Sequence, residues 1–335
     1  MTQPIRWGIL GTGKIAKAFA TALQDTPDAQ LVAVASRSVD SATKFIAEYA
    51  PGQAGVRAHG SYQALADDPE VDVVYIATPH PMHHENAIMC LNGGKALLVE
   101  KTFTMNRREA EEIFALARAK QLFVMEAMWT RFMPAVIEAR RIVDSGEIGA
   151  PANITADFGF TSDAGPEHRL FNPALGGGAL LDLGIYPLSM AAYFLGEVTG
   201  VKAQGEMTAD GVDMQTAFTL KHANGALSSC LCSLRSRTPT ELTISGTKGF
   251  LRLSDRFHNT EAFSVTVVSG ASRSERTVTV PRSGNGYTHE AQEVGRCLRA
   301  GLIESPVMPH AETLNLMGVL DDIRAQIGLR YSADQ

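Results

Sequence analysis

The feature that most constrains the fold of this chain is a glycine-rich turn near its N-terminus. The turn has the sequence Gly11-Thr12-Gly13-Lys14-Ile15-Ala16. It directly follows an apolar run at residues 5–10 and opens a helical pattern at residues 14–24. Gly11 permits the tight turn, Gly13 lets the backbone approach a pyrophosphate, and the small Ala16 lets the helix pack near the strand. Because a helix N-terminus offers free N–H groups to an anion, the first five residues of the turn are predicted to bind a nicotinamide dinucleotide in a Rossmann-type domain.

The first part of the chain alternates short apolar runs with helical patterns. The apolar runs lie at residues 5–10, 31–35, 73–77, 96–99 and 122–125. The helical patterns between them lie at residues 14–24, 41–49, 81–91 and 107–119. Continuous apolar strands separated by helices indicate a parallel sheet that is covered on both faces. We therefore predict a doubly wound α/β domain over residues 1–128.

The second part of the chain has a different pattern. A helical stretch at residues 132–145 is followed by runs in which apolar and polar residues alternate. Turn residues separate these runs, and most consecutive runs have no helical pattern between them. These runs lie at residues 151–160, 212–220, 226–234, 241–245, 250–254, 263–268 and 276–280. Helical patterns at residues 287–300 and 311–327 close the chain. We predict an α+β domain with an open antiparallel sheet over residues 129–335, and an active site between the two domains.

Charge and hydropathy exclude several classes of protein. The net charge of −6, without a clustered basic stretch, argues against a nucleic-acid partner. No apolar run reaches the roughly eighteen residues that a membrane span needs, and the first residues lack the pattern of a signal peptide. Cys90, Cys230, Cys232 and Cys297 show no spacing that favours a disulfide. We expect a cytoplasmic protein with reduced thiols and no membrane partner.

The end of the second predicted strand bears on the choice of cofactor. An NAD-preferring domain usually places an acidic residue there for the ribose 2′-hydroxyl, whereas this chain has Ser36 and Arg37. A cation with flanking serine hydroxyls suits a 2′-phosphate through charge-assisted hydrogen bonds. The alternative is that Arg37 is a solvated surface residue and Asp40 binds the ribose. Because Asp40 fits better in the first turn of the next helix, with Ser38 as the cap, we favour NADP(H) over NAD(H).

Two further segments carry candidate catalytic groups. Lys101 follows the fourth apolar run, at the sheet edge where parallel strands open into a ligand crevice. Its ammonium could stabilise an alkoxide during hydride transfer, or be a surface charge whose stem packs on the fold. Tyr186 precedes Pro187, which predicts a helix over residues 185–195 with the phenol in its first turn. The positive end of that helix would ease loss of the phenol proton, although a core tyrosine with a satisfied hydroxyl is the alternative.

Taken together, these residues resemble the Gfo/Idh/MocA family, named after glucose-fructose oxidoreductase and inositol dehydrogenase. Within it, the chain is similar to the branch of dimeric dihydrodiol dehydrogenases and NADP-dependent D-xylose dehydrogenases. The resemblance covers nearly the whole chain and rests on Gly11-x-Gly13-x-x-Ala16, Ser36-Arg37, Glu100-Lys101, Met125-Glu126-Ala127-Met128-Trp129-Thr130-Arg131-Phe132, Gly177-Gly178-Ala179-Leu180-Leu181-Asp182-Leu183-Gly184-Ile185-Tyr186 and Ser245-Gly246-Thr247-Lys248-Gly249. The Trp129 block and the tyrosine at position 186, where most of the family has histidine, mark the branch.

The resemblance implies a Rossmann domain followed by an open antiparallel sheet whose outer face commonly forms a homodimer. It implies that Lys101 and Tyr186 are the catalytic pair and that Asp182 is a supporting polar group. The substrate-binding positions that it implies are Trp129, Arg131, Phe158 and Arg169. The further cofactor-binding positions that it implies are Thr78, His83, Glu100 and Lys101.

One departure from the family concerns the residue that follows the lysine. The usual Glu-Lys-Pro of the family is Glu100-Lys101-Thr102 in this chain. The family proline often follows a cis peptide bond, and a cis bond before another residue costs about 2.5–4 kcal/mol. We therefore expect either a trans Lys101–Thr102 bond or a strained cis one.

A metal site is the alternative use of a histidine cluster. His80, His83 and His84 lie close together in the sequence. No thiolate or nearby carboxylate completes a tetrahedral ligand set, and hydride transfer to nicotinamide needs no zinc. We expect no metal.

The leading hypothesis is reversible oxidation of a secondary alcohol or hemiacetal carbon in a small sugar, polyol or vicinal diol. Tyr186 would take the hydroxyl proton, Lys101 would stabilise the charge, and the hydride would pass to the nicotinamide. The alternative is a regulatory protein that senses NADP(H) without chemistry, against which the retention of both residues argues. Aldoses, diols and inositol-like rings stay open as substrates, because the loop at residues 161–173 has no readable pattern.

Overall fold

The structure, a computed structural model, describes residues 3–53 and 55–334. The chain forms two compact units. Unit 1 comprises Met1–Trp129 and Ser283–Leu314. Unit 2 comprises Thr130–Arg282 and Asn315–Gln335.

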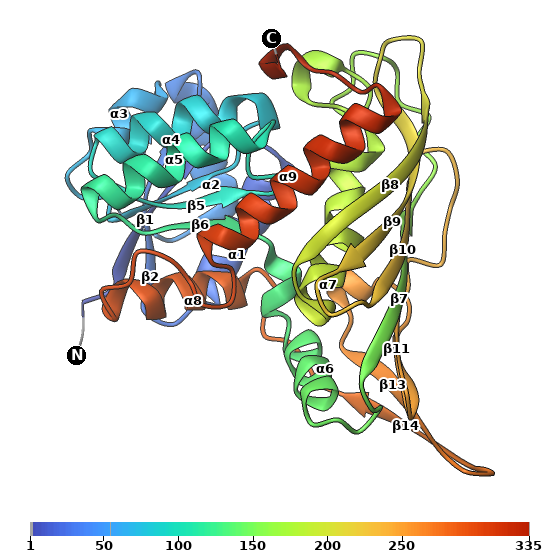
Figure 1. Ribbon diagram of the computed structural model, residues 1–335. Helices are drawn as coiled ribbons and strands as arrows, with labels where there is room; N and C mark the ends of the chain where they lie inside the picture. The colour runs from blue at the N-terminus through green and yellow to red at the C-terminus, as the bar shows by residue number, and fades with distance from the viewer. Residues whose placement is uncertain (1–2, 54, 335) are drawn as a thin grey trace. The chain divides into compact units, whose positions relative to one another are not determined.

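Unit 1 contains a parallel sheet with the strand order β3-β2-β1-β4-β5-β6 (Figure 1). Its strands are β1 (Ile5–Leu10), β2 (Ala29–Ala35), β3 (Arg57–His59), β4 (Val73–Ile76), β5 (Ala96–Glu100) and β6 (Val124–Ala127). Strands β4 and β5 are buried along their whole length, as continuous apolar runs require. The predicted doubly wound α/β fold is confirmed. The sequence analysis missed β3, because three half-buried residues give no apolar run.

Helices cover the parallel sheet in two groups. They are α1 (Lys14–Gln24), α2 (Val39–Tyr49), α3 (Tyr62–Ala66), α4 (His83–Asn92), α5 (Arg107–Lys120) and α8 (Thr288–Arg299). Helix α1 contacts α2 and α8, whereas α4 contacts α3 and α5. The apolar face of α1 places Phe19 on the sheet, where its ring stacks on Tyr75 at 3.8 Å and lies 5.2 Å from Trp7. Burial of these aromatic rings fixes α1, and with it the glycine-rich turn, on the strands.

Residues Ser283–Leu314 differ from the expectation that the chain after residue 128 forms one domain. The Asn285 side chain donates to the carbonyl of Ala18 at 2.7 Å. The imidazole of His310, at the start of α9 (His310–Ile327), bonds to the carbonyl of Val124 at 3.0 Å. These contacts join residues that are remote in sequence, so no local pattern could assign the segment to unit 1.

Unit 2 contains a mixed sheet with the strand order β14-β13-β12-β11-β7-β10-β9-β8 (Figure 1). Its strands are β7 (Pro151–Gly159), β8 (Val198–Met207), β9 (Asp213–His222), β10 (Leu227–Ser233), β11 (Leu242–Gly246), β12 (Gly249–Leu253), β13 (Ala262–Ser269) and β14 (Ser272–Thr279). The expected antiparallel sheet needs one correction, because β7 and β10 run parallel. A long crossover through α7 (Ile185–Leu195) and the β8–β9 hairpin brings the chain back in the same direction. The mostly exposed β8 was missed because it lacks a buried alternation.

Helix α7 packs against β7 and β10, and α6 (Pro134–Asp144) contacts β13. The α-helix begins at Ile185, as predicted, but a π-helical turn over Leu180–Gly184 leads into it without a break. Tyr186 therefore lies past the first turn of the helical segment, which corrects its expected place at the positive end of a helix. Among the described residues, the stretch Pro173–Leu195 is long and apolar enough to cross a membrane, but 94% of its window is buried, so it is a core helix.

Candidate functional site

The glycine-rich turn of unit 1 is shaped for a close approach of an anion. Gly11 has a φ of +101°, and a Cβ at this position would lie 2.9 Å from the carbonyl oxygen of Ala77. Its N–H donates to the carbonyl of Ala35 at 3.0 Å, which ties the turn to the end of β2. Gly13 is the N-cap of α1 and has no side chain to satisfy the first N–H groups of the helix. These residues fit the pyrophosphate of a dinucleotide, as the motif predicts.

The residues after β2 lie where the ribose of the dinucleotide is expected. The hydroxyls of Thr12 and Ser36 lie 3.3 Å apart, so the glycine-rich turn and the end of β2 meet. Arg37 is exposed, and its charge opposes the rise that burial causes in the pKa of Tyr62, so the two side chains are near each other. Ser38 caps α2, with Asp40 in the first turn. The helical place expected for Asp40 is confirmed, and the binding of Arg37 to the cofactor stays a prediction.

Lys101 directly follows β5, and the preceding residue, Glu100, fixes the backbone there. Glu100 is 6% exposed and accepts hydrogen bonds from the Tyr75 hydroxyl and, at 3.2 Å, from the backbone N–H of Lys101. Burial raises the pKa of Tyr75 well above its usual value, and the charge of Glu100 adds to the rise. The Lys101–Thr102 peptide bond is cis, one of the two expected alternatives.

His83 joins the loops that follow β4 and β5. Its side chain is fully buried, with one ring nitrogen 2.8 Å from the Thr78 carbonyl and the other 3.0 Å from the Thr102 carbonyl. Burial lowers the pKa of His83, which favours the neutral ring. A neutral ring has one N–H, so His83 can donate to only one of these carbonyls, and its expected place on the cofactor side stays a prediction. His84 pairs with Glu112 at 2.9 Å, and within residues 3–53 and 55–334 no group of three or more His, Cys, Asp or Glu side chains could hold a metal.

Unit 2 brings Tyr186 together with an aromatic cluster. The tyrosine is 7% exposed, and its ring centroid lies 5.4 Å from those of Phe158 and His258. The rings of Phe158 and His258 stack at 4.5 Å with an interplanar angle of 15°. Phe158 lies near the end of β7, and its expected role as a pocket wall stays a prediction. His258 was missed, because a single histidine in a short connection between strands gives no signal in the sequence.

Asp182 and Arg169 also lie together in unit 2. The guanidinium of Arg169 donates to the carboxylate of Asp182 at 2.9 and 3.4 Å. The Asp182 carboxylate is largely buried, whereas more than half of the arginine side chain is exposed. The two positions that the resemblance named separately are thus one ion pair, one turn of helix before Tyr186.

Two other expected substrate contacts are buried. Arg131 is 2% exposed, and its guanidinium donates to the Ser189 hydroxyl at 2.9 Å and to the Ser189 carbonyl at 2.8 Å. It therefore holds α7 in unit 2, a role that the sequence block did not reveal. Trp129 is 4% exposed and stacks on Tyr287 at 4.5 Å within unit 1.

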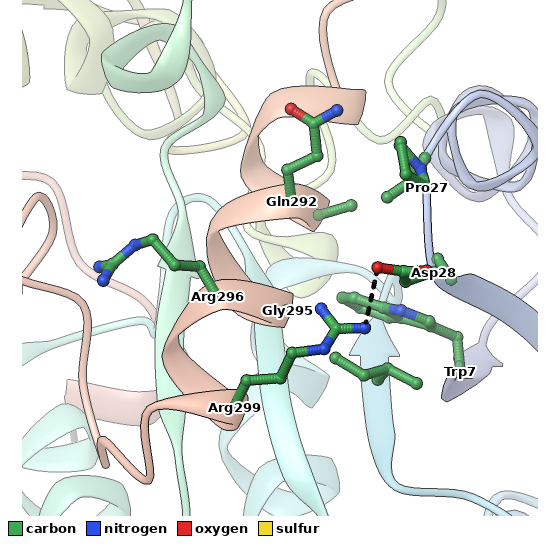
Figure 2. A pocket seen from close by; sticks show the side chains of 11 residues that line it. Trp7, Pro27, Asp28, Gln292, Gly295, Arg296 and Arg299 are labelled. Atoms are coloured by element: carbon green, nitrogen blue, oxygen red, sulfur yellow. Dashed lines mark ion pairs between the residues drawn. The ribbon is translucent and has the colours of Figure 1, made fainter. Parts of the chain in front are cut away.

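A cavity of about 370 Å³ lies at the opposite edge of the parallel sheet (Figure 2). Ile5 and Ala29, the first residues of β1 and β2, line it together with α8. Arg299 of α8 reaches Asp28 at 3.4 Å across its mouth (Figure 2). Ligands of doubly wound sheets bind at the carboxyl ends of the strands, so this cavity is not the predicted dinucleotide site.

Comparisons with known proteins agree with both units. Residues 5–128 match the sequence model of an oxidoreductase family with an NAD-binding Rossmann fold, GFO_IDH_MocA, and residues 136–252 match that of the GFO/IDH/MocA C-terminal domain. The trans-1,2-dihydrobenzene-1,2-diol dehydrogenase of Danio rerio is 36% identical over 342 residues, which cover 98% of this chain and 99% of that protein.

Solved structures share the fold over almost the whole chain. A levoglucosan dehydrogenase in complex with NADH and L-sorbose superposes with a TM-score of 0.87 at 22% identity, over 98% of this chain and 97% of that one. A 3-ketoreductase from Actinomadura kijaniata in complex with NADP and TDP-benzene has a TM-score of 0.84 at 25% identity, over 97% and 98% of the two chains.

Proposed function

We propose that this chain, which belongs to the Gfo/Idh/MocA family of NAD(P)-binding oxidoreductases, is an NADP(H)-dependent dehydrogenase of a small sugar, polyol or trans-dihydrodiol. The observation that carries the proposal is the phenol of Tyr186, buried against the rings of Phe158 and His258. An apolar, ring-lined environment around one proton-transferring group suits a small cyclic substrate. Full-length similarity to diol dehydrogenases supports the same substrate class.

The preference for NADP(H) rests on the ribose end of the turn. Arg37 is exposed beside the hydroxyl of Ser36, whereas Asp40 is occupied in the first turn of α2. A 2′-phosphate would accept charge-assisted hydrogen bonds from this guanidinium, and a ribose 2′-hydroxyl would find no carboxylate at positions 36 and 37.

Each candidate catalytic group is given one role in the proposed reaction. A dinucleotide held at the turn of Gly11 and Gly13 would supply the hydride chemistry through its nicotinamide ring. In the oxidising direction, the phenolate oxygen of Tyr186 takes the proton of the substrate hydroxyl and becomes the phenol, and the Lys101 ammonium stabilises the negative charge that develops on the substrate oxygen. Asp182, paired with Arg169, is the supporting polar group one turn before the tyrosine. Phe158, Trp129 and Arg169 are the proposed substrate contacts, and His258 joins them because it stacks on Phe158.

Replacing the phenol tests the proposal. Tyr186→Phe keeps the ring packing but removes the oxygen that accepts the substrate proton in the oxidising direction, so turnover of NADP with a diol or D-xylose should fall at least about a hundredfold while NADPH affinity is kept. Tyr193→Phe, on the same helix, is the matched control and should keep its activity. Unchanged turnover in Tyr186→Phe would remove the tyrosine from the mechanism. Tight NADPH binding with no turnover of D-xylose, D-glucose or cyclic diols would favour the NADP(H)-sensing alternative.

The outer face of the mixed sheet is the proposed dimer surface. Along β9 and β10, Phe218 and Cys230 are buried, whereas Ala217, Thr219 and Leu227 are exposed. Leu227 is a large apolar side chain with 58% exposure, which a second copy of the chain would cover. Light scattering should give a dimer for the native chain and a smaller mass for Leu227→Asp; a monomeric native chain would exclude the dimer.

The proposed location is the cytoplasm. The cysteines of the chain are free and buried, as expected of thiols in a reducing compartment. Burial raises the pKa of Cys90 to about 12, so this thiol stays protonated and unreactive at neutral pH.

A further inference from the structure

The helical segment that carries the proposed catalytic tyrosine begins at a carboxylate from another part of unit 2. Asp213, the first residue of β9, is fully buried. One oxygen of its carboxylate accepts the backbone N–H of Leu180 at 2.8 Å and the hydroxyl of Thr216 at 2.7 Å. Leu180 opens the π-helical turn that leads into α7, so its N–H belongs to the positive end of the helix. Asp213 thus occupies the place that the sequence analysis gave to the Tyr186 phenol.

The glycines before this turn let the carboxylate come close. Gly178 has a φ of +127°, and a Cβ at this position would clash with the second oxygen of Asp213. The Tyr331 hydroxyl donates to the carbonyl of Gly177 at 2.5 Å and holds the preceding peptide. The glycine run of the sequence is therefore explained by the approach of an internal carboxylate, and the proposed substrate chemistry does not require it.

Among the residues that the structure describes, no cation pairs with the carboxylate of Asp213. Thr216 lies on the same strand, Cys232 on β10 and Tyr331 in the C-terminal segment, and the Asp213 charge contributes to the raised pKa of both Cys232 and Tyr331. The nearby Arg324 is paired with Asp321 and Asp334. Burial raises the pKa of Asp213 to about 6, although the hydrogen bonds from Thr216 and Leu180 lower it. At neutral pH, the helix end thus meets a carboxylate, and in mild acid it meets a neutral acid.

We propose that Asp213 is a positioning residue for the dehydrogenase reaction, whose carboxylate fixes the end of the segment that places Asp182 and Tyr186. This inference rests on the proposed function. Asp182 lies in the π-helical turn itself, and its N–H reaches the carbonyl of Gly178 at 3.4 Å. A shift of the turn would move Asp182 and the phenol together. Misplacement of a catalytic group by about 1 Å can cost a hundredfold in rate, so a remote carboxylate can control turnover.

The test compares the pH dependence of kcat in two variants of this contact. Asp213→Asn keeps the shape but removes the charge, so kcat at pH 8 should fall about tenfold or more and the acidic limb near pH 6 should disappear. Thr216→Val removes a hydrogen bond to the carboxylate, so the acidic limb should move to higher pH. Thr43→Val, the same substitution at an exposed position on α2, is the control and should keep the native profile.

The outcomes separate this inference from the proposed function. A native kcat with the acidic limb still present in Asp213→Asn would overturn the positioning role. An acidic limb at the native pH in Thr216→Val would also overturn it. Should Asp213→Asn fail to fold, the shift in Thr216→Val decides the matter by itself. If the native chain turns over neither D-xylose, D-glucose nor cyclic diols, the proposed function fails. If Tyr186→Phe is inactive while both contact variants keep the native profile, only the positioning role fails. NADPH affinity should stay unchanged in every variant, because the nucleotide turn belongs to unit 1.

Discussion

The turns at the start of α1 and of the α7 segment are built differently: the first is proposed to meet the pyrophosphate of a cofactor, whereas the second meets the carboxylate of Asp213. In unit 1, Gly11 and Gly13 lie in one contiguous motif and leave the helix end open to a ligand. In unit 2, the helix end is closed by Asp213, which comes from a strand more than thirty residues later and hydrogen-bonds to Leu180. A local motif therefore encodes the proposed cofactor turn, whereas long-range contacts hold the turn that leads to the proposed catalytic tyrosine.

The largest expected effect comes from replacing a glycine of each turn by alanine. Gly178→Ala combines a backbone angle that favours glycine with a clash against Asp213, so the free energy of unfolding of unit 2 should fall by about 3 kcal/mol. Gly11→Ala meets the Ala77 carbonyl and should mainly abolish NADPH binding, with a smaller loss of stability. Urea denaturation and an NADPH fluorescence titration measure the two effects.

Tryptophan fluorescence allows the stability of unit 1 to be measured separately from that of unit 2. The two tryptophans of the chain, Trp7 and Trp129, belong to unit 1, so their fluorescence follows unit 1 while circular dichroism follows both units. For Gly178→Ala, dichroism should report an early transition that tryptophan fluorescence does not share. A Gly178→Ala protein with native stability would show that the Asp213 contact is loose and that the two turns are less different than described.

The next effect concerns two buried carboxylates whose pKa values shift in opposite directions, so that their contributions to stability change with pH in opposite ways. Burial raises the pKa of Asp213 in unit 2 to about 6 from 3.8, so its contribution to stability is complete below about pH 4 and is lost as the pH rises through 6. Burial acts in the same direction on Asp68 in unit 1, but hydrogen bonds from Arg57, Glu70 and His59 outweigh it and lower the pKa to about 2. The contribution of Asp68 is therefore present above pH 4 and is lost as the pH falls toward 2.

Isosteric amides should show these opposite signs. Asp213→Asn should be more stable than the native chain at pH 8, by up to about 3 kcal/mol, and the gain should vanish near pH 4. Asp68→Asn should be less stable by about 2 kcal/mol at pH 7, and its loss should vanish toward pH 2. Unfolding followed by dichroism and fluorescence over this pH range is the measurement. Equal signs for the two variants would contradict the electrostatic contrast between the units.

The sequence predicted the parts of the fold that depend on local periodicity. Strands such as β4 and β5 are buried on both faces, so their apolar runs are continuous and can be recognised without the rest of the chain. The parallel pair of β7 and β10 was not predictable in this way, because strand direction depends on a crossover that alternation does not record. For the same reason, the assignment of Ser283–Leu314 to unit 1 needed contacts with distant residues.

In the candidate site too, features that depend on neighbouring residues were predicted, and features that depend on distant residues were not. Ser38 as the cap of α2 was predicted correctly, because a capping residue acts on the turn that follows it. His258 and Asp213 were missed, since each contributes through a neighbour that lies far away in sequence. Arg131 stands in a block that marks the branch, but the sequence does not tell whether a guanidinium faces a ligand or, as here, donates to Ser189.

A smaller effect is expected at the ribose end of the open turn. Arg37→Ala removes the exposed cation beside Ser36, so the KM for NADP should rise about tenfold, or about 1.4 kcal/mol, while the KM for NAD should change little. Lys44→Ala, an exposed cation on α2, is the matched control and should leave both values unchanged. A parallel rise for both cofactors would mean that Arg37 contacts the shared part of the dinucleotide, and the preference for NADP would lose its support.

The smallest effect should come from the opposite edge of the same sheet. Asp28 has a φ of +61°, which asparagine also tolerates, so Asp28→Asn removes the charge that pairs with Arg299 and little else (Figure 2). The two side chains are 55% and 36% exposed, so the pair should contribute less than about 0.5 kcal/mol to stability. NADPH affinity should be unchanged, because the Gly11 turn lies at the carboxyl ends of the strands and Asp28 at their amino ends. Weaker NADPH binding in Asp28→Asn, together with a native affinity in Gly11→Ala, would move the cofactor to the wrong edge of the sheet and refute the assignment of the open turn.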